Sequence, residues 1–225
     1  MKLLDLFCCE GGAAMGYYRA GFEVTGVDIF EEFTQSRYPF ESHKSDAIEF
    51  VKKHGHKYDV IHASPPCQHA SAGTRAQDRS KYPQLIGPTR DALVALGKPY
   101  VIENVRGADL VDPIELCGCM FDLTAIDTDG ILLHLQRPRR FESNVPLSAP
   151  RSCDHSAHEW VGGSYGGARR DKYEAKHVRR GGYVPAKSVQ QELLGINWMT
   201  IKGMHQSIPP IYTECIGRQI LGALK

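Results

Sequence analysis

The sequence predicts an α/β protein built on a mostly parallel sheet, and three observations support this fold class. Four short apolar segments, at 2–7, 22–27, 58–63 and 100–105, have the length and residue types of buried parallel strands. Helical segments and glycine-containing turns separate most of them, as in repeated βαβ units. Polar residues stand at or near the ends of these segments, where open α/β sheets bind their ligands.

The length and composition are those of one globular domain. With 225 residues, of which 42% are apolar, the chain can bury a core but is short for two full domains. No apolar run approaches the roughly 18 residues of a membrane helix, and the first strand leads into a glycine turn rather than a signal-peptide cleavage region. Seven cysteines, an odd number, favour free thiols in a reducing compartment. We therefore expect an intracellular protein.

A glycine turn follows the first strand. Gly11 and Gly12 allow the backbone to turn tightly and approach a ligand, and the helix expected at 13–20 presents unpaired N–H groups there. The second strand ends in Asp28, whose carboxylate can hold ribose hydroxyls. This combination predicts a site for a nucleotide-like cofactor, with a plain turn and a surface aspartate as the alternative. Asp46 is expected to cap a further helix and is also a candidate contact for an adenine ring.

A cysteine follows the third strand, on a turn stiffened by two prolines. In HASPPCQHAS, at 62–71, the prolines end the strand, so Cys67 is expected in a loop at the carboxyl edge of the sheet. Glu103 reaches the same edge on the next strand, and a charged residue within an apolar strand is costly unless it is paired or functional. A loop cysteine without chemistry and a rim glutamate are the alternatives.

Two arginines of RPRRF are expected to act together. In an extended strand over 132–141, Arg137 and Arg139 share one face and can clamp an anion or a nucleobase, unless they are simply solvated. A basic segment begins here: residues 137–187 carry a net charge of +6, which leaves −5 for the rest of the chain. Such a segment is typical of a face that binds a polyanion, and a solvated loop is the alternative.

The region 143–187 has no secondary-structure period. Glycines alternate there with aromatic residues and with basic residues, a composition that suits phosphates and unstacked bases of a nucleic acid. We therefore divide the chain into a catalytic and cofactor-binding core at 1–142, a small basic segment at 143–187, and C-terminal helices at 188–225 that return to the core.

The sequence predicts four further helices. One is expected at 31–37 and another from Pro88 to Leu96. Ser188 and Gln191 are spaced as a capping box for the next helix, and a last helix at about 209–224 is expected to pack beside the first strand and the glycine turn.

Five residues with metal-binding side chains stand in a CxC pair and a later CxHxxH sequence. They are Cys117, Cys119, Cys153, His155 and His158. Their spacing matches no standard zinc finger, so we expect them to pack in loops rather than to bind a metal.

Taken in order, these segments resemble the motifs of the DNA cytosine-5 methyltransferases over most of the chain. DLFCCEGG is similar to the family's S-adenosylmethionine-binding motif, PPCQ to its nucleophile motif, ENV to its acid motif and RPRRF to its paired-arginine motif. SIPPIYTECIGRQIL is similar to the C-terminal helix that returns to the cofactor. Five such similarities in one order make the resemblance specific. It implies a Rossmann-like methyltransferase sheet with a small irregular target-recognition segment.

The resemblance also implies roles for individual residues. It implies catalysis by Cys67, Glu103, Arg137 and Arg139; binding of S-adenosylmethionine by Phe7, Gly11, Gly12, Asp28, Ile29, Asp46, Ala47 and Pro66; and contact with DNA by Gln68, Ser71, Arg169, Arg170, Lys172, Lys176, Arg179 and Arg180. The implied cofactor leaves as S-adenosylhomocysteine, and the implied partner is double-stranded DNA. We expect a monomer without a membrane partner, in the cytoplasm of a bacterial host, similar to the short phage and prophage members and to the enzymes of restriction–modification.

The implied chemistry explains these residue types. Carbon 5 of cytosine is too electron-poor to accept a methyl group until a nucleophile adds to carbon 6, and a thiolate such as that of Cys67 suits this step. A protonated Glu103 would bond ring N3 and the exocyclic amine, and Arg139, with Arg137 as support, would steady the carbonyl oxygen of the base. Because the ring is inaccessible in a duplex, the base must be flipped out.

The sequence departs from the family pattern at several positions. Cys9 stands where the family has a glycine, His69 and Ala70 follow Gln68, and Arg218 replaces the asparagine of a C-terminal GN. The target segment is short for the family, so we expect a simple or relaxed sequence preference. Three alternatives stay open: methylation of cytosine in transfer RNA, a non-catalytic nucleic-acid-binding relative, and a dinucleotide oxidoreductase, which would leave PPCQ and ENV without a role.

Overall fold

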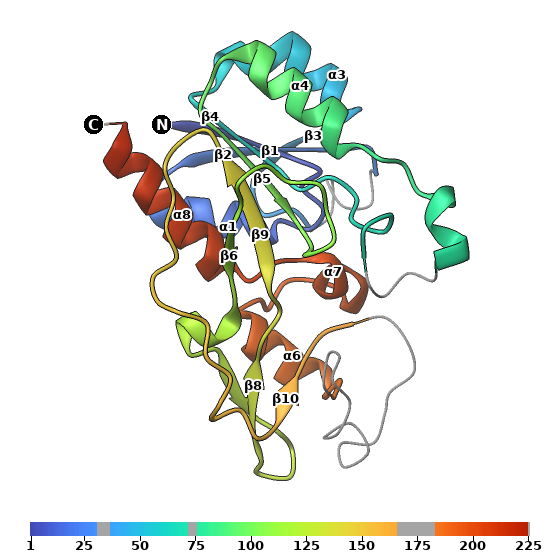
Figure 1. Cartoon of the computed structure of the whole chain (residues 1–225), viewed down its shortest axis with the longest axis vertical. Coiled ribbons are helices and arrows are strands. Elements are labelled where there is room, and N and C mark those ends of the chain that lie inside the picture. Colours follow the sequence, from blue (N-terminus) through green and yellow to red (C-terminus); the bar gives the residue numbers. More distant parts are fainter. Residues whose placement is uncertain (31–36, 72–75, 166–182, 225) are drawn as a thin grey trace.

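A seven-stranded sheet forms the centre of the molecule. The computed structural model describes residues 1–30, 37–71, 76–165 and 183–224, so all but the last residue of the helix expected at 31–37, and the basic cluster from Arg169 to Arg180, lie outside the described residues. Five parallel strands are followed by two antiparallel ones (Figure 1). In spatial order the strands are β3 (Glu41–Lys44), β2 (Glu23–Asp28), β1 (Lys2–Leu6), β4 (Val60–Ala63), β5 (Tyr100–Asn104), β9 (Arg139–Ser143) and β6 (Ile114–Leu116). The mostly parallel α/β sheet predicted from the sequence is confirmed.

Helices cover both faces of this sheet because its central strands are buried on both sides. On one face α1 (Gly12–Ala20) and α8 (Pro210–Ala223) pack on side chains such as Leu3. On the other, α3 (Ala47–His54) and α4 (Ile86–Leu96) pack on side chains such as Leu4. Successive residues of a strand point to opposite faces, which is why an unbroken apolar run forms β1.

The last helix lies against the first, as the sequence analysis predicts. The hydroxyl of Thr213 on α8 donates a hydrogen bond to the carbonyl of Ala13 on α1 at 2.8 Å. At Gly16 a Cβ atom would overlap the carbonyl oxygen of Pro210, so only glycine allows the two backbones to approach this closely. α8 thus closes the face of the sheet that carries the glycine turn.

A smaller lobe adjoins the main sheet. Its three strands are β7 (Thr124–Ile126), β8 (Leu132–Leu135) and β10 (Val161–Gly162), packed with α6 (Lys187–Leu194) and α7 (Ile201–Gln206) around their own apolar core. Figure 1 shows β8, β10 and α6 at the opposite end of the molecule from α3 and α4. The lobe takes strands from both sides of residue 143.

Three local elements differ from those expected from the sequence. The expected single strand at 132–141 is wrong: it breaks into β8 and β9, because Arg137 has a φ of 41° and Pro138 has no N–H for a ladder. The expected capping box is also wrong, since the N-cap of α6 is Ala186, two residues before Ser188, and no side chain caps the helix. The helix expected from Pro88 begins at Ile86 and ends, as expected, at Leu96.

Short 3-10 helices complete the described chain. They are η1 (Gly55–Lys57), η2 (Ala76–Lys81) and η3 (Gly118–Phe121). No helix in the described ranges combines the length and the apolar character that a membrane crossing requires.

Candidate active site

The turn between β1 and α1 has an unusual backbone. Phe7, Cys9 and Gly11 have φ angles of 60°, 48° and 85°, all in the left-handed region that favours glycine. A Cβ atom at Gly11 would lie 2.8 Å from the Cδ of Pro39, so this position accepts only glycine. Cys9 keeps the left-handed conformation although it has a side chain, and this fits the resemblance, which implies a glycine at this position.

Asp28 lies beside this turn, at the carboxyl end of β2. Its carboxylate accepts the N–H of Cys9 at 3.0 Å and the N–H of Phe30 at 3.1 Å. Burial raises the pKa of Asp28, and these backbone bonds oppose the rise. Ile29 and Phe30 follow with 59% and 57% of their surfaces exposed. A buried carboxylate next to exposed apolar side chains suits an adenosine group, which offers ribose hydroxyls and a flat ring.

Asp46 caps a helix, as the sequence analysis predicts. Its Oδ1 accepts the N–H of Glu49 at 2.9 Å, at the N-terminus of α3. Ala47, the first residue of α3, is buried in the core. Asp46 follows β3 and Asp28 ends β2, and these two strands are parallel neighbours, so the two carboxylates occupy the same edge of the sheet. Contact of Asp46 with an adenine ring stays a prediction.

The Cys67 loop leaves the carboxyl end of β4 and is tied to the neighbouring strand. The side-chain amide of Asn104, at the end of β5, donates to the carbonyl of Pro65 at 2.9 Å. The N–H groups of Ala70 and Ser71 both donate to the carbonyl of Cys67, at 3.0 and 2.8 Å, which closes a tight turn around the thiol. The ENV and PPC segments therefore form one unit, and the Cys67 thiol is only partly covered.

A carboxyl group and a guanidinium flank the thiol. The Nε of Arg139 lies 3.3 Å from the Oε1 of Glu103, and both side chains are largely buried. Burial raises the pKa of Glu103 above its ordinary value, and the charge of Arg139 opposes the rise. Burial also raises the pKa of the Cys67 thiol, with the Glu103 charge adding to this effect and the charges of Arg139 and Arg137 opposing it. The charges of Glu103 and Arg139 are therefore close enough to the thiol to influence its protonation.

The adjacent loop side chains have individual positions. Pro66 and Gln68 are partly covered, and the side-chain oxygen of Gln68 is buried without a hydrogen-bond partner among the described residues. Ser71 is likewise partly covered and ends this described part of the loop. An unpartnered buried oxygen is costly, so Gln68 is suited to a partner from outside the chain.

Arg137 lies elsewhere than the sequence analysis expects. Its side chain is 1% exposed, and its guanidinium donates to the carbonyls of Ser164, Met204, His205 and Ser207 at 2.6 to 3.1 Å. With φ at 41°, the residue does not share a strand face with Arg139. Burial lowers the pKa of Arg137 to about 10. This arginine joins the main sheet to the lobe.

Comparison with known proteins finds that the chain is similar to methyltransferases. The type II methyltransferase M.AgeI of Thalassovita gelatinovora is 30% identical over 164 residues, which are 61% of this chain and 38% of that protein. The type II methyltransferase M.HgiDI of Herpetosiphon aurantiacus is 30% identical over 121 residues, 49% of this chain and 38% of that protein. Over these regions the chain is similar to type II methyltransferases. The aligned region spans under two fifths of the length of these two curated relatives.

Solved structures agree with this type II methyltransferase relationship at the level of the fold. A structure described as a DNA modification methyltransferase encoded within an E. coli prophage has a TM-score of 0.63 at 15% identity, covering 100% of this chain and 99% of that one. The Dnmt2 methyltransferase of S. pombe has a TM-score of 0.59 at 11% identity, covering 99% of each chain. No protein-family model matches the chain. The resemblance inferred from the motifs is confirmed.

The structural role of Glu10 in this chain was not expected from the sequence. Its side chain, which is 2% exposed, accepts the N–H and the hydroxyl of Thr200 at 2.7 and 2.6 Å, and its carbonyl accepts the indole N–H of Trp198 at 2.7 Å. Thr200 is the N-cap of α7, so a carboxylate from the glycine turn stands at the N-terminus of this helix and Arg137 at its C-terminus. These signs suit the helix dipole. A glutamate within a turn carries no signal of such a partner 190 residues away.

A buried hydrogen-bonded chain under the Cys67 loop was also missed. The hydroxyl of Tyr17 and Nδ1 of His62 are 3.0 Å apart, and Nε2 of His62 lies 2.9 Å from the hydroxyl of Ser64. Burial lowers the pKa of His62 to about 3, so this ring is neutral. Ser64 in turn bonds the carboxyl group of Glu103. The chain fixes the strand end from which the loop begins.

Proposed function

We propose that the protein transfers a methyl group from S-adenosylmethionine to carbon 5 of cytosine in DNA, through a covalent adduct of Cys67. One observation supports this most strongly: a partly covered thiol, a carboxyl group with a raised pKa and a buried guanidinium meet at the carboxyl edge of β4 and β5. The left-handed turn and Asp28 lie at the same edge, on the neighbouring β1 and β2. Nucleophile and cofactor elements on one sheet edge suit a single reaction.

The roles of the side chains follow from their environments. The Cys67 sulfur, once deprotonated, adds to carbon 6 of the ring, and its electron pair forms the new carbon–sulfur bond. Because burial raises the pKa of Glu103, this carboxyl group can hold a proton and donate a hydrogen bond to ring N3, which takes up the negative charge of the addition. Arg139 bonds the carbonyl oxygen of the base. Once carbon 5 carries the methyl group, its proton passes to solvent, and the electron pair of that carbon–hydrogen bond restores the ring double bond and expels the Cys67 thiolate.

The residues of the turn fit the group that donates the methyl. When bound, S-adenosylmethionine supplies the methyl group that carbon 5 accepts. Gly11 and Gly12 give the backbone close approach, Asp28 holds the ribose hydroxyls, and Ile29 and Asp46 border the adenine ring. Phe7, Ala47 and Pro66 complete the proposed lining.

DNA is the proposed substrate because a structure with a similar fold is described as a DNA modification methyltransferase, and because the side-chain oxygen of Gln68, next to Cys67 in the sequence, has no partner among the described residues. We assign Gln68 and Ser71 to contacts with the flipped base and its neighbours, and the basic cluster between 169 and 180 to phosphates. Stacked and paired bases of duplex DNA cannot present carbon 6 to the Cys67 thiol, so the target base leaves the stack.

A genome-wide map of 5-methylcytosine tests the proposal. The protein is expressed in a host without cytosine methylation, beside Cys67→Ala and the control Cys215→Ser, which removes another free, partly buried cysteine, on α8. We expect a methylated motif with the intact protein and with the control, and none with Cys67→Ala. Methylation of transfer RNA instead of DNA would move the function to RNA. If the purified, folded protein binds S-adenosylmethionine but methylates neither, the catalytic proposal fails.

A further inference from the structure

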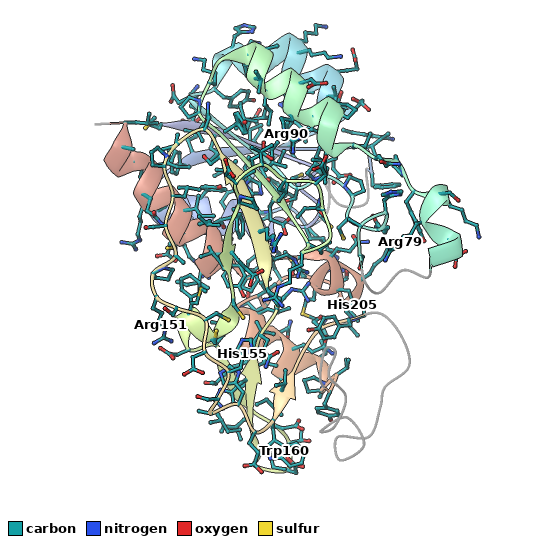
Figure 2. All side chains as sticks on the ribbon, viewed as in Figure 1. Arg79, Arg90, Arg151, His155, Trp160 and His205 are labelled. Atoms are coloured by element: carbon teal, nitrogen blue, oxygen red, sulfur yellow. The ribbon has the colours of Figure 1, made fainter. Side chains whose placement is uncertain are left out.

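Four metal-binding side chains meet at the junction between the main sheet and the small lobe. They are Cys117, Cys119, Cys153 and His155, whose sulfur and nitrogen atoms all lie within 4.8 Å of one another. Cys117 and Cys119 flank the start of η3, directly after β6, while Cys153 and His155 belong to the segment between β9 and β10. Figure 2 shows His155 and Arg151 at the level where the sheet passes into the lobe. Packing in loops was expected here, because the spacing of these residues in the sequence matches no standard zinc finger.

We propose that this cluster is a structural zinc site of the Cys3His type. In a tetrahedral site with Zn–S of about 2.3 Å and Zn–N of about 2.0 Å, neighbouring ligand atoms are roughly 3.5 to 3.8 Å apart. The observed separations are 3.3 Å between the sulfurs of Cys119 and Cys153, and 3.2 and 3.3 Å from Nε2 of His155 to the sulfurs of Cys117 and Cys153. The remaining separations are at most 4.8 Å, so a metal ion fits between these atoms with changes in separation of about 1 Å or less.

The surroundings suit a site with a negative charge. Zinc with three thiolates carries a net charge of −1. The positive charge of the Arg106 guanidinium interacts electrostatically with Cys117 and Cys153. Arg151 donates to the carbonyl of Cys119 and holds that turn in place. Binding releases one proton from each thiol to solvent and involves no redox step. The carbonyl of Gln136, to which the Cys117 thiol now donates, keeps the N–H of Gly118 at 2.6 Å.

Two other arrangements of these side chains are less consistent with the geometry. A disulfide between Cys119 and Cys153 requires a sulfur separation of about 2.05 Å and leaves Cys117 and His155 without a role. A purely packed cluster would not need four metal-binding side chains close to one point, one of them the exposed Cys153. A closed set of four ligands, with no position left for a substrate, is typical of structural zinc.

The zinc would fasten the segment 144–160 to the end of β6. This segment leads from β9 to β10, the edge strand of the lobe. The lobe would therefore depend on the metal for its position, while β1, β4 and β5 with Cys67 and Glu103 would not.

Elemental analysis of the purified protein tests the proposal without reference to methyl transfer. We expect one zinc per chain, retained by Cys215→Ser and by His158→Ala, and lost in Cys153→Ser. His158 is the matched control, because it belongs to the same CxHxxH sequence but is not one of the four clustered ligands. His155→Cys, which supplies a thiolate instead of an imidazole, should retain the zinc. Cobalt in place of zinc should give the intense visible bands of a tetrahedral thiolate site.

Limited proteolysis adds a structural measurement that does not depend on any variant folding. A chelator that strips the zinc should expose the segment 144–160 to cleavage, and added zinc should restore protection. The proposal is overturned if the unmodified protein holds no more zinc than Cys153→Ser, or if its intact mass under non-reducing conditions shows a Cys119–Cys153 disulfide.

Discussion

Replacing Asp5 with asparagine should remove a large part of the pH dependence of stability. Asp5 lies on β1 with 1% of its surface exposed; Oδ2 accepts the hydroxyl of Tyr38 at 3.3 Å, and Oδ1 has no partner among the described residues. Burial raises the pKa of Asp5 from 3.8 to about 8, helped by the charge of Asp28 and opposed by the Tyr38 bond. The folded state therefore keeps a proton that the unfolded state loses.

The sign and size of the effect follow from this difference. Stability from the retained proton is complete below pH 3.8 and is lost as the pH rises toward the folded pKa of about 8. Each pH unit in this window corresponds to about 1.4 kcal/mol, so the loss between pH 5 and pH 8 is about 4 kcal/mol. Asparagine has the same shape and does not titrate.

Urea unfolding at pH 5, 6, 7 and 8 in reducing buffer measures the effect. The free energy of unfolding of the unmodified protein minus that of Asp5→Asn should fall by several kcal/mol from pH 5 to pH 8. The corresponding difference for Asp91→Asn, at an exposed position on α4, should not change with pH. Parallel curves for Asp5→Asn, within the error of about 10–15% of extrapolated stabilities, would show that Asp5 ionises normally in the folded protein.

Three further predictions concern the site and its support. Glu103→Gln should lower the pKa of the Cys67 thiol, because the carboxylate charge raises it, and alkylation of the thiol by iodoacetamide should become faster. Methyl transfer by the same variant should fall by a factor of about 100 or more. Arg139→Gln should instead slow alkylation, because the charge of Arg139 lowers the pKa of the thiol. Asn104→Ala should cost about 1–3 kcal/mol in urea unfolding and loosen the thiol loop, so unchanged alkylation would contradict the role given to this amide. Arg90→Ala removes both bonds to a nearly buried carboxylate on β9 and should cost about 3 kcal/mol, which a chemical denaturation curve would reveal.

Local patterns in the sequence predicted the parts of the fold that local physics decides. Apolar runs of strand length became β1, β2, β4 and β5, the glycine turn took its left-handed backbone, and Asp46 capped α3. Cys67 follows a buried strand because two prolines end that strand, and this could be deduced from the sequence. The polar edge strand β3, ESHK, gave no apolar signal and was missed.

Features that depend on distant partners were not predictable in this way. The position of Arg137 is set by carbonyls at 164 and 204–207, none of which its own RPRRF context reveals. Cys117 and Cys153 meet only because β6 and β9 pair at the edge of the sheet. Glu10 has no local pattern that indicates Thr200. Contacts between side chains of the sheet and side chains of the lobe can be identified only from the tertiary structure.

The packing of α8 on α1 has a consequence for the order of events during synthesis. The helix that covers one face of the sheet is made about 200 residues after the helix it packs on, as the Thr213–Ala13 bond shows. At roughly 5–20 residues per second, the ribosome leaves apolar residues such as Leu3 and Tyr17 uncovered for about 10–40 s. The opposite face can be covered by α3 and α4 much earlier. The nascent chain therefore has one finished face and one face open to chaperones until α8 emerges.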